Sequence, residues 1–213
     1  MSEIESNQEA AGKAFEDGMN LIQDIAGWTE ISSTSEITVY QRPTESGINA
    51  VKTESFFNKP FADMAEYCWN HWREFETSLW DVIKHIEYVK EYEDGSRLRL
   101  ERTKNFGPVS PREGYLYFSK QQLDENTIVI LATSTSLEFP VFEGHVRGEL
   151  TFSIQIFEAV NGDTSKTHLT TLDQANPKGS LPIIIVNEFN MDRVKFYENL
   201  INKLNMSNHT RDF

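Results

Sequence analysis

The feature that most constrains the fold is an amphipathic segment near the C-terminus, residues 182–204. Pro182 suits the first turn of a helix, because its φ is fixed and it has no N–H to lose. After it, apolar residues recur at helical spacing on one side, with charged residues opposite. The main ones are Ile185, Phe189, Phe196, Leu200 and Leu204. Burying these five would contribute roughly 7–15 kcal/mol, so we predict a long helix whose apolar face lies on a sheet.

The rest of the chain is predicted to contain two further helices and, mainly, β-strands. Residues 1–12 are expected to form a disordered leader, a first amphipathic helix ends at Gly27, and Pro60 opens a second one. From Val82 the apolar period falls towards two, which predicts strands. Their expected ranges are 82–92, 97–104, 114–120, 127–135, 145–157 and 167–174. We therefore predict an α+β fold with a curved antiparallel sheet, as a single domain of residues 13–205 followed by a flexible tail, 206–213.

Composition narrows the classes of partner. The chain has 213 residues and a formal net charge of -13, which argues against nucleic acid and against permanent adsorption to anionic membranes. Its single cysteine, Cys68, allows no internal disulfide and suits a reducing compartment. The N-terminal residues lack the apolar core of a secretory signal. We expect a cytoplasmic monomer.

Signatures of catalysis are missing from the sequence. It has no Gly-Lys phosphate loop, no Gly-x-Ser-x-Gly elbow and no helix with paired histidines. The five histidines are scattered without ligand spacing, and Cys68 sits among apolar helix positions, where a packed side chain is expected. The sequence therefore predicts no catalytic residue, no metal site and no cofactor.

Two strand segments alternate polar and apolar residues. In residues 97–102 one face carries Arg97, Arg99 and Glu101 and the other Leu98, Leu100 and Arg102; residues 150–155 place Thr151, Ser153 and Gln155 on one side. These polar faces are either the wet side of an ordinary sheet or the lining of a cavity. Charges that point inward would have to pair or bind a polar ligand group.

Four segments, taken together, resemble the START domain family of lipid-transfer modules. Residues 106–113 read Phe-Gly-Pro-Val-Ser-Pro-Arg-Glu, similar to that family's Pro-Val-Ser-x-Arg-Asp loop. Trp80-Asp81 stands upstream, and downstream come Gly-His-Val-Arg-Gly-Glu at 144–149 and Asn-Pro-Lys-Gly-Ser-Leu-Pro at 176–182. The resemblance covers about residues 14–205, and the motifs are most similar in sequence to those of members that carry phosphatidylcholine or ceramide.

The resemblance implies a helix-grip fold with a cavity that holds one lipid, of order 300–1,000 Å³. Asp81 stands at the position where such members use an acidic residue to hold the headgroup. Those members also have an arginine four residues earlier, where this chain has Thr77. Arg99 with Glu101 or Asp81 is a candidate ion pair. By this register the expected cavity residues are Asp81, Arg99, Glu101, Thr103, Leu116, Phe118, Thr151, Ser153 and Phe189. The expected gate consists of Phe106, Pro108 and Val109 on a loop, with Leu181 and Ile185 at the start of the last helix.

The function implied by the resemblance is lipid binding and transfer between membranes without chemistry, for a phospholipid or ceramide-like amphiphile. The expected partners are the lipid ligand and, transiently, a membrane surface. Two alternatives stay open: a helix-grip enzyme similar to polyketide cyclases, and a sterol-binding carrier or lipid sensor.

Overall fold

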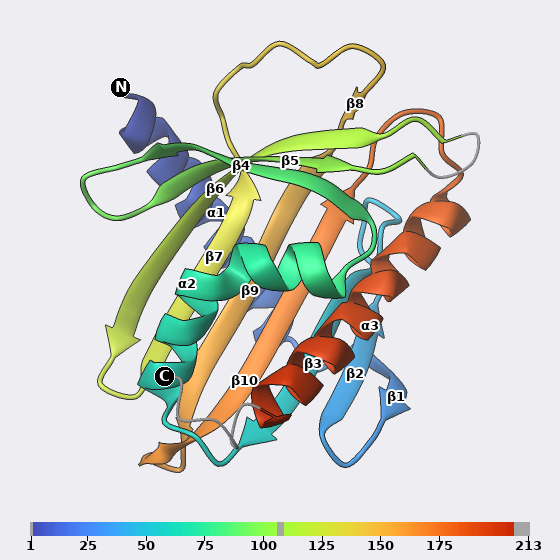
Figure 1. Ribbon diagram of the computed structural model, residues 1–213. Helices are drawn as coiled ribbons and strands as arrows, with labels where there is room; N and C mark the ends of the chain where they lie inside the picture. The colour runs from blue at the N-terminus through green and yellow to red at the C-terminus, as the bar shows by residue number, and fades with distance from the viewer. Residues whose placement is uncertain (1, 106–108, 207–213) are drawn as a thin grey trace.

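The structure, a computed structural model, describes residues 2–105 and 109–206, with the backbone alone for 189–194 and 206. An antiparallel sheet with helices on both faces makes up the fold (Figure 1). Its strands are β1 (Thr29–Ser33), β2 (Ile37–Arg42), β3 (Ala50–Phe57), β4 (Ile83–Glu91), β5 (Arg97–Thr103), β6 (Arg112–Asp124), β7 (Thr127–Ser134), β9 (Glu149–Val160) and β10 (Asp163–Asn176). Their spatial order in this part of the chain is β1-β2-β3-β10-β9-β7-β6-β5-β4, and the short β8 (Val146–Arg147) pairs with β6 in parallel.

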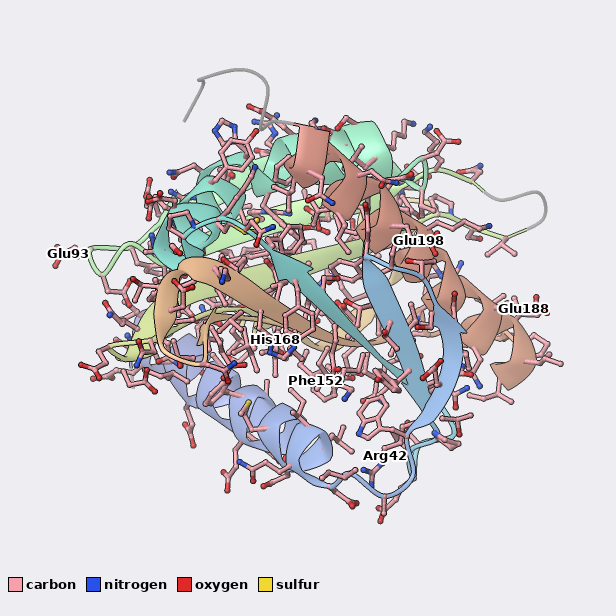
Figure 2. The ribbon with its side chains drawn as sticks, turned by 90° about the horizontal axis from the view of Figure 1, so that it is seen from below. Arg42, Glu93, Phe152, His168, Glu188 and Glu198 are labelled. Carbon is pink, nitrogen blue, oxygen red and sulfur yellow. The ribbon has the colours of Figure 1, made fainter. Side chains whose placement is uncertain are left out.

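Three helices form the outer two layers of the part that the structure describes. Helices α2 (Phe61–Leu79) and α3 (Ile183–Met206) cover one face of the sheet, hereafter the inner face, and α1 (Glu3–Gln23) covers the outer face (Figures 1 and 2). Each face has its own apolar core, and the inner one contains Trp72, Phe196 and Leu200. The predicted α+β helix-grip architecture, with the last helix lying on a sheet, is confirmed.

Helix α1 begins much earlier than the sequence indicated. Residues 3–12, expected to be a disordered leader, are helical because Ser2 and Glu5 form a reciprocal capping box at the N-terminus. The first turns are also anchored: Asn7 is fully buried, and its Oδ1 accepts a hydrogen bond of 2.6 Å from Thr135 Oγ1. Of the expected tail, Met206 ends α3 and residues 207–213 lie outside the described part.

Helix α2 carries an aromatic face that fills much of the inner side of the sheet. It includes Trp69, Trp72 and Phe75. The Trp72 and Phe196 rings meet edge to face, 5.4 Å between centroids, and so join α2 to α3. Among the residues that can be placed, no helix is both long and apolar enough to cross a bilayer.

Candidate functional site

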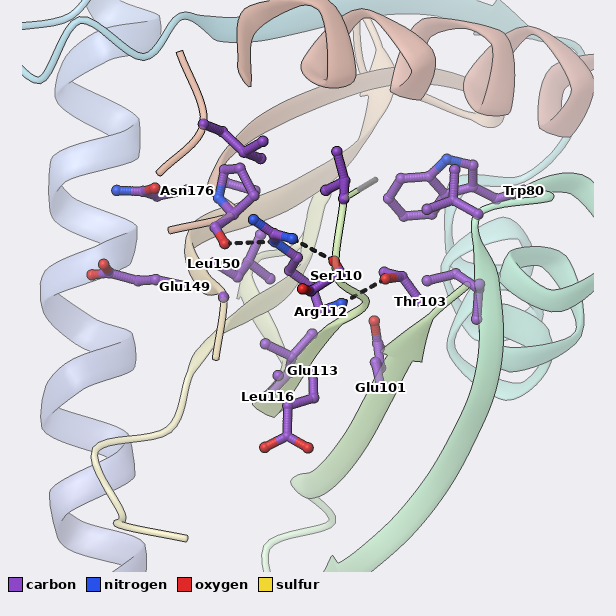
Figure 3. A pocket seen from close by; sticks show the side chains of 18 residues that line it. Trp80, Glu101, Thr103, Ser110, Arg112, Glu113, Leu116, Glu149, Leu150 and Asn176 are labelled. Atoms are coloured by element: carbon purple, nitrogen blue, oxygen red, sulfur yellow. Dashed lines mark hydrogen bonds between the residues drawn. The ribbon is translucent and has the colours of Figure 1, made fainter. Parts of the chain in front are cut away.

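A cavity of about 170 Å³ opens at one end of the inner face (Figure 3). Its walls are the ends of β5, β6, β9 and β10, the segment 80–83 after α2, and the connections before β6 and α3. Trp80, Ile83, Leu116, Leu150 and Leu181 make the lining largely apolar, while Glu101 and Thr103 contribute polar groups. An apolar wall with a few placed polar groups is the usual character of a small-molecule site.

The cavity is smaller than the 300–1,000 Å³ that the sequence analysis expected. The reason lies in the large side chains between the helices and the sheet. Trp69, Trp72, Phe75 and Phe196 pack there, and the void beside Trp72 and Phe118 measures about 10 Å³. The inner face is therefore hollow at one end and packed where these side chains meet.

An ion triad is buried next to the cavity. Arg99 on β5 is 2% exposed and forms ion pairs with Glu76 of α2 and with Glu101 two residues further along β5. Its guanidinium carbon also lies 4.0 Å from the centroid of the Phe118 ring. Burial alone would lower the pKa of the Arg99 guanidinium, but the two carboxylates outweigh that effect and raise it. The ionised triad carries a net charge of −1.

Glu101 connects this triad to the cavity, because its side chain is 11% exposed and lines the cavity wall. Thr103, two residues along the same strand, is on the same side, and its Oγ1 accepts a hydrogen bond of 2.8 Å from the Arg112 backbone N–H. The inner end of the cavity therefore contains a largely buried carboxylate, which is negatively charged and accepts hydrogen bonds. Such a group favours hydrogen-bond donors and cations.

Arg112 holds the two connections at the cavity mouth together. Its Nη1 donates to the Ser110 carbonyl and its Nε to the Pro177 carbonyl at 3.0 Å (Figure 3). Its Nη2 donates to the Lys178 carbonyl at 3.0 Å. Burial lowers the pKa of this guanidinium. Gly179 also belongs to this contact: its φ is +75°, and a Cβ there would come within 3.2 Å of Arg112 Nη2.

Several predicted site residues do line the cavity. They are Glu101, Thr103, Leu116, Val109 and Leu181. Arg99 and Phe118 lie beside the smaller void instead. Ser153 is buried on the sheet, and neither it nor Ile185 appears among the lining residues that can be placed. Phe106 and Pro108 lie outside the described residues, as does the side chain of Phe189.

Asp81 and Thr151 do not occupy their predicted places. The Asp81 side chain is fully exposed and pairs with Lys104 at the surface, so it faces solvent rather than the cavity. Thr151 is skipped by the strand register, since Gln174 pairs with Phe152 while Ala175 pairs with Leu150. This bulge breaks the alternation of faces, and Leu150 rather than Thr151 lines the cavity.

Trp80, Arg112 and Leu150 also line the cavity, although the sequence did not predict them as site residues. Trp80 and Arg112 belong to the motifs that carried the family resemblance, so their positions were a usable signal. Leu150 gave no signal, because only the bulge turns it inward. Glu76, the third member of the ion triad, lies 23 residues before Arg99 on another element, which sequence spacing does not link to it.

Comparison with known proteins gives one family and one fold. A model of the START domain matches residues 10–197, whereas a search of curated proteins finds no match. The structure of human StAR-related lipid transfer protein 5 is similar, with a TM-score of 0.73 and 19% identity over 94% of this chain and 97% of that one. Human STARD10 gives 0.68 and 16% over 91% and 82%. A STAR-related lipid transfer protein fragment from Xanthomonas axonopodis gives 0.64 and 18% over 83% and 99%.

Proposed function

The chain belongs to the START domain family, and from that premise we propose that it binds one amphiphilic lipid in the cavity and carries it between membranes without changing it chemically. The observation that carries this proposal is the apolar cavity with a buried acidic group at its inner end. A lipid in transit must keep its apolar part away from water while a few polar groups hold its headgroup. We further propose a cytoplasmic monomer that meets membranes transiently.

The chemistry of the lining favours a headgroup that donates hydrogen bonds, such as the hydroxyl and amide groups of a ceramide-like lipid. Glu101 is an acceptor at the inner end. The nearby guanidinium groups already have partners: Arg99 contacts two carboxylates through its Nη2, and Arg112 donates to three carbonyls. A phosphate would have to compete with these partners, which makes a phospholipid the less favoured of the two expected ligands.

The size of the cavity implies that loading includes an opening step. A lipid with two chains needs far more room than about 170 Å³, so the start of α3 has to move away from the segment around Val109. The contacts that close the mouth are compatible with such a step. Arg112 donates hydrogen bonds to the Pro177 and Lys178 carbonyls, and these can be exchanged for hydrogen bonds to water. The glycine at position 179 provides freedom for that movement.

Native mass spectrometry tests the proposal. The purified chain is incubated with vesicles that contain equal amounts of a ceramide, a phosphatidylcholine and a sterol, and the mass of the complex identifies the ligand. We expect one ceramide per chain, lost in Glu101→Ala and kept in the control Asp81→Ala, whose carboxylate faces solvent. A complex with none of the lipids would overturn the proposed function. A complex with another lipid, equally formed by Glu101→Ala, would overturn the assignment of the headgroup.

A further inference from the structure

Buried polar side chains form a band on the inner face of the sheet, deeper than the cavity. The band belongs to β3, β9 and β10, and each of its side chains is between 1% and 6% exposed. We call these residues the polar band: Thr53, Ser55, Ser153, Gln155, Thr171 and Asp173. Apolar side chains are expected in the middle of a sheet face that two helices cover, so a polar group of this size requires an explanation.

The strand register makes the polar band continuous with the cavity wall. Leu150 lines the cavity, and the next inward-facing residues of β9 are Ser153 and then Gln155, because the residues that alternate with them belong to the outer core. Strand pairing places Asp173 beside Ser153 and Thr171 beside Gln155. The polar side chains therefore follow one another from the cavity to the centre of the sheet.

Hydrogen bonds within the protein satisfy only part of the polar band. The hydroxyl oxygens of Thr53 and Thr171 are hydrogen-bonded at 2.7 Å. Within the part of the chain that the structure describes, Ser55 Oγ has no hydrogen-bond partner, and the Ser153 hydroxyl and the Gln155 amide form no side-chain hydrogen bond. A buried polar group without a partner destabilises a fold, so it indicates a place where a ligand or a water completes the hydrogen bonding.

The polar band lies far from the acidic group of the cavity. Glu101 is on β5, and two strands, β6 and β7, separate it from Ser153 on β9. Three strand spacings amount to roughly 14 Å. The inner face between them is apolar, with Leu116 on β6 and Ala132 on β7. A molecule that reaches from Glu101 to Ser153 therefore needs an apolar middle and a polar group at each end.

The helices that cover the polar band are the ones that loading has to move. Figure 1 shows α2 crossing in front of β9, and α3 running beside β10 and β3, against which it packs. The opening step proposed for loading moves α3 relative to these strands. The end of the ligand that enters deepest can then reach Ser153 and Gln155.

We propose that Ser153 and Gln155 form a second polar subsite, which binds a hydroxyl or carbonyl group at the end of the ligand opposite its headgroup. This inference rests on the proposed lipid-carrier function and narrows the ligand class to amphiphiles that are polar at both ends, such as a ceramide-like lipid whose acyl chain ends in a hydroxyl. A plain hydrocarbon end would leave both side chains without partners. A hydroxyl can accept a hydrogen bond from Gln155 Nε2 and donate one to Ser153 Oγ.

Two matched lipids test the subsite by native mass spectrometry. The chain is incubated with equal amounts of two short-chain ceramides that differ only in a hydroxyl at the end of the acyl chain. We expect the hydroxylated lipid to be preferred about fivefold, the scale of one added hydrogen bond. Ser153→Ala and Gln155→Leu should each remove most of this preference and still bind the plain lipid, since Glu101 is unchanged. The control Thr170→Val removes a buried hydroxyl from the opposite face of β10 and should keep the preference.

Urea unfolding distinguishes a ligand subsite from a structural role. Removing a buried polar group that has no partner should leave the stability of the lipid-free chain unchanged or raise it. A clear loss of stability in both Ser153→Ala and Gln155→Leu, with the lipid preference intact, would overturn the inference, because the protein itself or a bound water would then complete the polar band. Equal binding of both lipids by the unmodified chain would also overturn it and leave the carrier function standing. Binding of neither lipid would overturn both proposals.

Discussion

Removing the cation of the buried triad is predicted to destabilise the fold strongly. In Arg99→Met the side chain keeps most of its volume, but the carboxylates of Glu76 and Glu101, which are 8% and 11% exposed, lose their shared partner. Breaking a buried ion pair by removing one partner typically costs about 3–5 kcal/mol, since a charge is left uncompensated. For a chain of this length, that loss corresponds to a drop of about 6–20 °C in Tm.

Urea unfolding at pH 7 measures the effect. The control Arg97→Met lies on the same strand, where Arg97 pairs with the exposed Glu91 at 3.5 Å and lies over the Trp69 ring at 4.5 Å. An exposed pair and a cation–π contact together predict a loss of only about 1–2 kcal/mol. Replacing the whole triad, with Glu76→Leu and Glu101→Leu added to Arg99→Met, should recover most of the stability, since no buried charge remains.

Two results would refute this reasoning. One is a loss below about 1 kcal/mol in Arg99→Met, which would mean that water reaches the carboxylates freely. The other is a triple variant that is less stable than Arg99→Met. Removing the two carboxylates would then cost further stability, although they should be unfavourable once their cation is gone. In either case the assignment of a buried, negatively charged group at the inner end of the cavity would fail.

Further predictions concern helix α1 and one turn. Gly18→Ala should destabilise the fold by about 1–3 kcal/mol in urea unfolding, because its Cβ would lie 2.3 Å from Ile154 Cδ1. Gly12→Ala, with open space around it, should stabilise by up to about 1 kcal/mol; equal effects would contradict the packing of α1. Hydrogen bonds from Ser165 and the Lys166 charge lower the pKa of Asp163 to about 2. The stability difference from Asp163→Ala should therefore be full above about pH 4 and shrink towards pH 2; a difference independent of pH in that range would contradict it.

The parts of the fold that depend on local patterns were predictable from the sequence. The long last helix follows from Pro182 and the apolar spacing after it, and the strands follow from alternation, both of which are properties of neighbouring residues. The inward position of Glu101 follows from the same alternation once one face of β5 is assigned to the cavity. The start of α1 also has a local signal, since Ser2 and Glu5 have capping-box spacing, although residues 3–10 lack the apolar periodicity that marks the rest of the helix.

The parts that depend on distant contacts were not predictable in this way. The partnership of Arg99 with Glu76 exists only because α2 packs over β5. The bulge at Thr151 shifts the register by one residue, and one residue is enough to exchange the faces of a strand. Asp81 turns outward to Lys104, which its sequence position after Trp80 does not reveal. The volume of the cavity depends on how the aromatic side chains of α2 and α3 interlock.

The most direct test of the carrier function is to lock the cavity mouth. Val109 and Leu181 line it from opposite connections, so cysteines are introduced at both positions, and mass spectrometry verifies that oxidation joins them. The native Cys68 does not interfere, because it is fully buried and its burial raises the thiol pKa to about 12. The measurement is the rate at which a fluorescent ceramide moves between two vesicle populations. Transfer by the reduced variant that stops on oxidation and returns with reductant is the predicted result; equal transfer by the oxidised variant would contradict a lipid carried behind this mouth.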